Sequence, residues 1–157
     1  MTIDDASLEQ TKQANVGQLL IRCARLWNEE GLARARTAMD RPIRAAHLAL
    51  FAHIDLAGTR LTEISRRADL SKQAIHPLIS ELERWKLLER IEDPNDGRAK
   101  IIRFTQEGRE AMLRGLTILS SIEQEIAQSM SPERVQLLGS LLRDLLQTLE
   151  QDIDRSR

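Results

Sequence analysis

Residues 60–104 read RLTEISRRADLSKQAIHPLISELERWKLLERIEDPNDGRAKIIRF. Two helix-compatible segments, 62–68 and 72–84, flank a short polar turn at 69–71. A charged stretch, 90–104, follows; it is centred on a turn in which proline fixes one φ angle and Asp-Gly tolerates positive ones. This order predicts helix, turn, helix and a two-stranded wing, so the expected fold is mainly α with a small β-wing, a winged helix-turn-helix.

The composition is typical of a helical protein. Apolar residues make up 41% of the 157 residues, charged residues 30% and aromatic residues 3%, which disfavours a β-sandwich and a disordered chain. No apolar run approaches the roughly 18 residues that span a bilayer, the N-terminus lacks the features of a secretory signal, and Cys23 is the only cysteine. We therefore expect a cytoplasmic protein with no disulfide and no membrane partner.

The charge distribution bears on nucleic-acid binding. The whole chain has a net charge of −1, which does not by itself favour a nucleic-acid partner. Between positions 60 and 103, ten Lys and Arg residues stand against eight Asp and Glu residues, a net charge of +2. The positive excess therefore falls in the segment expected to read DNA. The mildly acidic remainder leaves open a winged helix that serves as a protein-interaction module.

Amphipathic segments precede this unit. Apolar residues at three- and four-residue steps predict one helix over about 8–39, which Pro42 ends. A second helix is expected over 43–54 and a short strand at 59–61. Thr62 is then placed to cap the next helix.

The C-terminal third is expected to be helical and to form a dimer. Thr105 is a suitable N-cap, and Ser131-Pro132-Glu133 marks a helix restart. Leucines in the last helix spread over more than one stripe, which is more apolar surface than one intrachain contact would cover. This excess favours burial against a second copy of the chain, with an intrachain helix bundle as the alternative. The 157 residues are thus expected to form one domain, with a DNA-binding lobe over about 43–104 and dimerisation helices over about 8–39 and 105–154.

The second helix of the pair carries the residues expected to read DNA, because a recognition helix places its N-terminal residues nearest the base edges. Ser71 can cap the helix and meet a phosphate, Lys72 suits a phosphate or guanine, and Gln73 can pair with adenine. His76 lies one turn later on the same face and can donate or accept. Pro77 predicts a bent or irregular start to this helix. The alternative is an ordinary amphipathic surface helix.

The tip of the wing carries an arginine beside a carboxylate. Arg98 at a β-tip can enter a narrow minor groove, where the potential is most negative, and Asp96 can hold its guanidinium by a charge-assisted hydrogen bond. The alternative is a solvated hairpin with an incidental ion pair. The full set expected to contact DNA is Arg60, Arg66, Ser71, Lys72, Gln73, His76, Asp96, Arg98 and Lys100.

Six short motifs occur in order: HLALF at 47–51, LTEI at 61–64, SKQA at 71–74, ELER at 81–84, DPNDGR at 93–98 and TQEG at 105–108. With the helical flanks they resemble the MarR family of bacterial repressors, over roughly 19–149. The resemblance implies a homodimer whose first and last helices interlock, a palindromic double-stranded operator, and release from DNA when a small molecule or an oxidant arrives. The chain departs from the family at Pro77 and at Lys86, where a glycine commonly ends the recognition helix. Lys86 must therefore adopt a left-handed conformation or let the helix end differently.

The same resemblance implies a ligand site where the dimerisation helices meet the DNA-binding lobe. The candidates are Trp27, Arg44, His47 and Phe51, which supply aromatic walls, a cation and a titratable ring. For Trp27, which lies on an apolar stripe, a plain core position is the alternative. We therefore expect a transcriptional regulator, a repressor released by a small aromatic or anionic ligand.

Cys23 offers a different signal, because thiol-switch members of the family carry a cysteine in this region and Arg22 and Arg25 flank it. However, Cys23 falls on the apolar stripe, and the chain has no tyrosine to support a thiolate as in peroxide-sensing relatives. A buried structural thiol is therefore favoured over a redox switch. No spacing indicates a metal site, no nucleophile–base pair or phosphate-binding loop indicates an enzyme, and no cofactor is expected.

Overall fold

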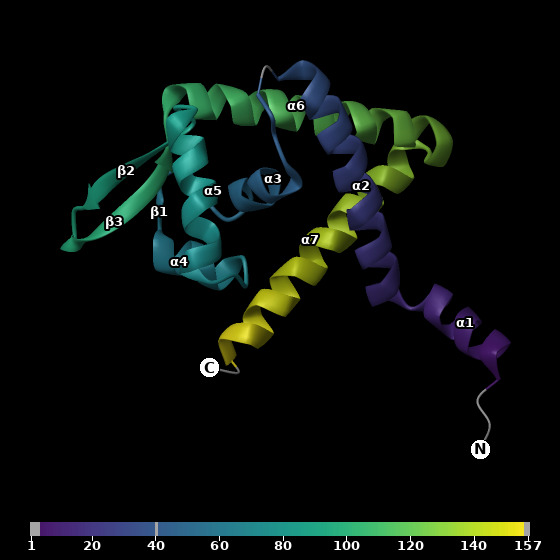
Figure 1. The fold of residues 1–157 in the computed structure, drawn as a ribbon. Helices are drawn as coiled ribbons and strands as arrows, with labels where there is room; N and C mark the ends of the chain where they lie inside the picture. The colour runs from purple at the N-terminus through teal and green to yellow at the C-terminus, as the bar shows by residue number, and fades with distance from the viewer. Residues whose placement is uncertain (1–3, 40, 156–157) are drawn as a thin grey trace. The chain divides into compact units, whose positions relative to one another are not determined.

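The computed structural model describes residues 4–39 and 41–155. It is mainly α-helical with one small antiparallel sheet (Figure 1), which confirms the expected fold class. The chain divides into two compact units after Gly115. No helix within the described residues is both long and apolar enough to cross a bilayer. The elements are α1 (Asp5–Ala14), α2 (Val16–Ala38), α3 (Ala45–Phe51), β1 (Thr59–Arg60), α4 (Leu61–Arg67), α5 (Lys72–Arg84), β2 (Leu88–Asp93), β3 (Asp96–Phe104), α6 (Gln106–Met130) and α7 (Pro132–Arg155).

The N-terminal helical region is two helices, so the expectation of one helix over 8–39 is wrong. Asn15 separates α1 from α2 with an extended backbone (φ −72°, ψ 123°). Its side-chain oxygen accepts a hydrogen bond of 3.0 Å from the backbone N–H of Gln18. Asparagine competes with the helix in this way, because its side chain caps a new N-terminus instead of leaving the backbone to continue. Apolar periodicity does not register such a break.

One apolar core holds the winged-helix lobe together. On α5, the side chains of Ile75, Ile79 and Leu82 are fully buried, and they pack with Ile64 of α4 and Leu50 of α3. Complete burial of each such side chain contributes roughly 1.5–3 kcal/mol. The recognition helix is therefore fixed by its inner face. The other core members are Ile54, Leu87, Leu88, Ile102, Phe104 and Ala111.

The wing is an antiparallel hairpin with a short third strand. The sheet order is β1-β3-β2, and the hairpin register runs from Leu88 opposite Phe104 to Asp93 opposite Asp96. An irregularity between Glu92 and Asp93 shifts the register near the turn. Figure 1 shows β2 and β3 projecting from the end of α5 as a two-stranded arm. Both the wing and the short strand near position 59 are thus confirmed.

Two glycines allow close backbone approaches in this unit. At Gly58, where φ is 101°, an added Cβ would lie 2.4 Å from Cγ2 of Ile101. At Gly108, it would lie 1.9 Å from the carbonyl oxygen of Leu87. That carbonyl accepts from the N–H of Thr105 at 3.1 Å, and the Thr105 hydroxyl accepts from the N–H of Gly108 at 3.0 Å. Thr105 is therefore the expected N-cap, and it places the start of α6 against the end of α5.

The two helices of the reading unit begin differently. The prediction that Thr62 caps the first of them is wrong: α4 already starts at Leu61, with Arg60 in the cap position and no side-chain cap bond. The prediction for Ser71 is confirmed, because its hydroxyl accepts from the N–H of Ala74 at 3.2 Å. A short hydroxyl side chain thus sets the start of α5, whereas the pairing of β1 with β3 sets the start of α4.

The recognition helix runs without interruption across Pro77, so the expected irregular start is not found. The hydrogen bond that proline removes would end on the carbonyl of Gln73, and both residues are exposed, so water can take its place. At the other end, Lys86 adopts the left-handed conformation with φ 59°. The N–H of Leu87 donates back to the carbonyl of Leu82 at 2.9 Å. This pattern closes the helix as a glycine does in a Schellman motif.

Candidate nucleic-acid interface and adjoining pocket

The first two turns of α5 present the side chains expected to read DNA. Ser71, Lys72, Gln73 and His76 are all exposed, while the opposite face of the helix is buried in the core. Within the described part of the chain, the side chains of Lys72 and Gln73 have no hydrogen-bond or ion-pair partner. Their polar groups are therefore available to an external ligand, whereas the Ser71 hydroxyl already caps the helix.

The other expected cations have acidic partners on the same chain. The pairs are Arg60–Asp93 (Nε to Oδ2, 2.5 Å), Arg66–Glu63 (Nη2 to Oε1, 2.5 Å) and Lys100–Glu92 (Nζ to Oε1, 3.1 Å). Each cation remains about half exposed. Exposed ion pairs contribute little to stability, typically below about 1 kcal/mol. Arg66 and Lys100 can therefore exchange an acidic partner for a phosphate at small cost, whereas Arg60 would leave the buried carboxylate of Asp93 without its cation.

Asp93 lies beside the turn of the wing, and sequence reasoning did not select it as a site residue. The residue is buried, its carboxylate accepts from Nε of Arg60, and it also accepts from the backbone N–H of Asn95 at 2.8 Å. The bond from Asn95, followed by that from Arg60, holds the pKa of Asp93 below its usual value. An aspartate that bonds to the backbone two residues ahead is a recognisable turn signal. The expected Asp96–Arg98 pair stays a prediction, because the side chain of Arg98 lies outside the described atoms.

Arg90 is a second residue that sequence reasoning missed. It lies on β2, where its Nη1 is 3.3 Å from Nε2 of His76. Its Nε is 2.9 Å from Oε1 of Glu83, which lies two turns beyond His76 on α5. No local pattern could have found this cluster, because 14 positions separate the arginine from the histidine. The strand thus touches the recognition helix next to its exposed face.

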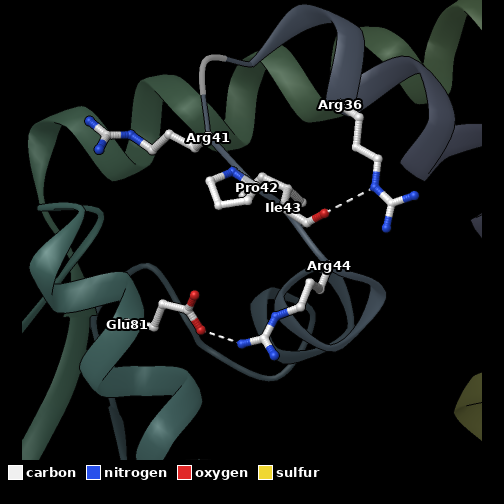
Figure 2. A pocket seen from close by; sticks show the side chains of 6 residues that line it. All are labelled: Arg36, Arg41, Pro42, Ile43, Arg44 and Glu81. Atoms are coloured by element: carbon white, nitrogen blue, oxygen red, sulfur yellow. Dashed lines mark hydrogen bonds and ion pairs between the residues drawn. The ribbon is translucent and has the colours of Figure 1, made fainter.

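A cavity of about 560 Å³ adjoins the N-terminus of α3 within the same unit (Figure 2). Arg36 donates from Nε to the carbonyl oxygen of Ile43 at 3.3 Å. Arg44 pairs with Glu81 of α5, and Figure 2 shows these two side chains extended toward each other. Arg41 pairs with Glu107 at 2.8 Å, so Arg36 and Arg44 are the lining cations that lie nearest to Ile43 and Glu81. The residues that line the cavity are Arg36, Arg41, Pro42, Ile43, Arg44 and Glu81.

His47 lies behind the residues that line the cavity and is fully buried. Its Nδ1 accepts from the backbone N–H of Arg44 at 3.3 Å, and its Nε2 lies 3.2 Å from Oε2 of Glu81. A ring that accepts at Nδ1 carries its proton on Nε2, so it donates to the carboxylate. The ring of Trp85 meets it edge-on at 5.0 Å. Burial lowers the pKa of His47, and Arg44 lowers it further against the opposing charge of Glu81.

The four candidate ligand residues do not form one site. Arg44 lines the cavity, and His47 contacts its wall. Phe51 instead packs against Phe104 of the core, with ring centroids 5.5 Å apart. Trp27 is half-buried on α2 and is not among the residues that line the cavity. Cys23 is exposed, so the expected buried thiol is wrong for the single chain.

Comparisons with known proteins agree with this architecture. Residues 42–99 match the model of the family described as the MarR family. No curated protein matches the chain. Wild-type apo MarR from E. coli is 19% identical, with 84% of this chain and 97% of that chain covered and a TM-score of 0.69.

Two solved structures of the regulator CouR are also similar. CouR bound to a 23-mer DNA duplex is 20% identical, with 93% of this chain and 99% of that chain covered and a TM-score of 0.66. CouR from Rhodococcus jostii RHA1, bound to p-coumaroyl-CoA, is 22% identical, with 89% and 94% covered and a TM-score of 0.66. At these identities the likeness shows a shared fold, a winged helix-turn-helix with helical flanks.

Proposed function

Because the chain belongs to the MarR family, we propose that it is a homodimeric, sequence-specific DNA-binding regulator, a repressor that a small anionic ligand releases from a palindromic operator. The observation that carries the proposal is the exposed start of α5, where the Lys72 and Gln73 side chains have no partner among the described residues; its inner face is fully buried, and a charged hairpin projects beside it. This arrangement suits a helix in the major groove with a wing beside it.

Gln73 and Lys72 have separate roles in this proposal. The Gln73 amide is able to pair with adenine N6 and N7, which reads sequence. Lys72 supplies a positive charge near the helix N-terminus, which suits a phosphate. Arg60, Arg66 and Lys100 add phosphate contacts, Arg66 and Lys100 by leaving their acidic partners. The near-neutral charge of the chain is thus compatible with DNA binding, because the cations concentrate around α5 and the wing.

The dimer is supported by apolar side chains that the single chain leaves uncovered. Six leucines of α7 are each at least 40% exposed, and α2 exposes four further large aliphatic side chains. Large exposed apolar patches are rare on soluble monomers, so each of these helices is expected to be covered by another surface. A second copy of the same chain is the occupant that also supplies the second half-site reader of a palindrome. The side chains are Leu137, Leu138, Leu141, Leu142, Leu146 and Leu149 on α7, and Val16, Leu19, Ile21 and Leu26 on α2.

Selection of duplexes from a random pool, followed by sequencing, tests the DNA-binding proposal. We expect two inverted half-sites whose centres are about 10–10.5 base pairs apart, or a multiple of that spacing. Affinity should fall steeply with salt, and Lys72→Ala should reduce the slope of log affinity against log salt by roughly one. Gln73→Ala should relax base preference instead. Recovery of no enriched sequence, or binding that ignores salt, contradicts the proposal and favours a protein-interaction module.

The ligand is proposed to be a small anion in the cavity of Figure 2, because three arginines and a single carboxylate line it. A cavity of about 560 Å³ has the size of ordinary small-molecule sites. Arg44 is already paired with Glu81, a residue of the recognition helix. An anion that binds Arg44 competes with that carboxylate for the guanidinium charge, and a weaker Arg44–Glu81 pair would act directly on α5.

Benzoate and benzyl alcohol form a matched pair of probes for this site, since they share a ring and differ in charge. Trp85, next to His47, reports binding by fluorescence. We expect saturable binding of benzoate alone, loss of it in Arg44→Met, and tighter binding in Glu81→Gln, which lacks the competing charge. Equal responses to the two probes, or weaker benzoate binding in Glu81→Gln, would contradict the proposal that the cavity binds an anion. Neither result would bear on DNA binding by α5.

A further inference from the structure

We propose that Arg90 fixes the tautomer of His76, so that the second turn of the recognition helix reads DNA only as a hydrogen-bond donor. The inference deepens the proposed function, on which its DNA-reading part depends. It rests on the contact of 3.3 Å between Nη1 of Arg90 and Nε2 of His76. A guanidinium carries donors and no acceptor. For this contact to be a hydrogen bond, Nε2 must be the ring nitrogen without a proton.

The arginine is held firmly enough to impose this choice. Arg90 is part of the β2–β3 ladder, opposite Ile102 of the buried sheet face. Its Nε is buried and lies 2.9 Å from Oε1 of Glu83, in an orientation that makes an ion pair without a hydrogen bond. Glu83 lies seven residues beyond His76 on α5, on the same side of the helix. The guanidinium is therefore fixed between a strand and the helix, and its Nη1 is left to face the imidazole.

The neutral imidazole then carries its only proton on Nδ1. This nitrogen has no hydrogen-bond partner in the described part of the chain, and His76 is exposed. An unconstrained histidine chooses either tautomer to suit the partner it meets. His76 loses that freedom, because accepting at Nδ1 would require a proton on Nε2, directly against a guanidinium N–H. His76 can therefore only donate a hydrogen bond, and it donates from Nδ1.

A donor in the major groove discriminates among bases. Guanine offers acceptors at N7 and O6, adenine at N7 and thymine at O4, whereas the edge of cytosine offers an N4 donor. His76 should therefore favour guanine and reject cytosine at the base pair that it meets. Gln73, one turn earlier, both donates and accepts. Gln73 would then pair with a base that offers either a donor or an acceptor, whereas His76 would require an acceptor.

The tautomer is measured first, in the free protein, by NMR of the imidazole nitrogens at a pH where the ring is neutral. His76→Gln identifies the resonances of this residue. We expect wild-type His76 to carry its proton on Nδ1, and Arg90→Met to shift the population toward the Nε2–H form. Glu83→Gln, which loosens the arginine without removing it, should shift it in the same direction by less. A wild-type ring protonated on Nε2, or populations unchanged in both variants, overturns the inference.

The base preference is measured by selection from a random duplex pool. We expect His76→Ala to lose the guanine preference at one base pair of each half-site, and Arg90→Met to admit cytosine there, with the discrimination falling roughly tenfold. Arg103→Met is the matched control: it removes the same charge from the same hairpin, since Arg103 pairs with Glu89 at 2.7 Å and does not touch His76. The control should keep the preference.

The outcomes separate the two proposals. An Nδ1–H tautomer with no DNA selected refutes the DNA-reading part together with the proposed function. DNA selected by a wild-type protein whose His76 carries the Nε2 proton refutes this inference alone. A uniform fall in affinity of His76→Ala for all sequences also refutes it, because His76 would then contact only a phosphate.

Discussion

The winged-helix lobe and the last helix bury their apolar side chains to very different degrees. On α5, Ile75, Ile79 and Leu82 are fully buried by residues of the same chain. On α7, Leu137 and Leu141 remain 59% and 56% exposed, although that helix is richer in leucine. Each Å² of apolar surface removed from water contributes roughly 25 cal/mol, so α7 forgoes much of its available stabilisation in the single chain. The lobe is therefore complete by itself, whereas α7 requires another surface.

The largest effect is expected from a charge placed on the exposed face of α7. Leu141→Glu should abolish the dimer, because an unpaired charge buried in an interface costs about 3–5 kcal/mol and a twofold axis applies it in both subunits. Sedimentation equilibrium should show half the wild-type mass, with the helical circular dichroism retained. Leu141→Ala is the milder control. A dimer of wild-type strength in the charged variant would show that α7 is not completed by a second copy.

In the lobe, the corresponding truncation should act on folding instead of assembly. Leu82→Ala removes a fully buried side chain and should lower the free energy of unfolding by about 2–5 kcal/mol. Urea titrations at two protein concentrations measure the effect. The loss should be the same at both concentrations, unlike that of an α7 variant. A loss below 1 kcal/mol would mean that the lobe core tolerates a cavity and is less complete than its burial indicates.

Gly108→Ala should produce a smaller loss, about 1–3 kcal/mol, because the new Cβ overlaps the carbonyl of Leu87 and the junction of α5 with α6 must shift. Gly115→Ala, farther along α6, is the control. Its Cβ meets nothing within 4 Å, so alanine should stabilise the helix by up to about 1 kcal/mol. Thermal unfolding of both variants compares the two sites. Equal shifts of Tm would show that the close approach of Gly108 to the Leu87 carbonyl does not position α6.

The smallest effect concerns pH and His47. Burial lowers the pKa of His47 from its usual value of 6.5, so the unfolded chain binds a proton more readily than the native one. Above pH 6.5 the ring is neutral in both states; below it, the unfolded state gains the proton first and stability falls, by at most about 1.4 kcal/mol per pH unit. His47→Gln should remove this contribution. Urea midpoints at pH 7.5 and 5.5 that fall equally in both proteins would contradict the assignment.

Sequence reasoning was most successful where local chemistry sets the structure. Ser71 and Thr105 are caps because a short hydroxyl side chain satisfies a free N–H at a helix start. The turn after Asp93 follows from proline and Asp-Gly chemistry. The break at Asn15 was missed because the apolar stripe that begins at Val16 was extended back to Leu8, the one large apolar residue of α1. The helix persists across Pro77, where both the proline and Gln73, whose carbonyl loses its partner, are exposed, so that water can take its place; propensity alone does not reveal this.

The candidate site was less predictable because its contacts are non-local. The sequence identified the exposed start of α5 but not the acidic partners of Arg60 and Lys100, which come from elsewhere in the fold. Arg90 and Glu81 were missed for the same reason. Arg90 contacts His76 only because β2 packs against α5, and Glu81 contacts His47 only because α3 packs against α5. Periodicity reports which face of a helix is buried, and it carries no information on what stands opposite that face.

The most direct test is the mass of the complex formed with a duplex recovered from the random pool, measured by multi-angle light scattering. A self-contained reader joined through uncovered flanking helices predicts two chains per duplex. It also predicts that Leu141→Glu prevents this complex while leaving the lobe folded. A stable complex of one wild-type chain per duplex, with affinity unchanged in Leu141→Glu, would contradict the account.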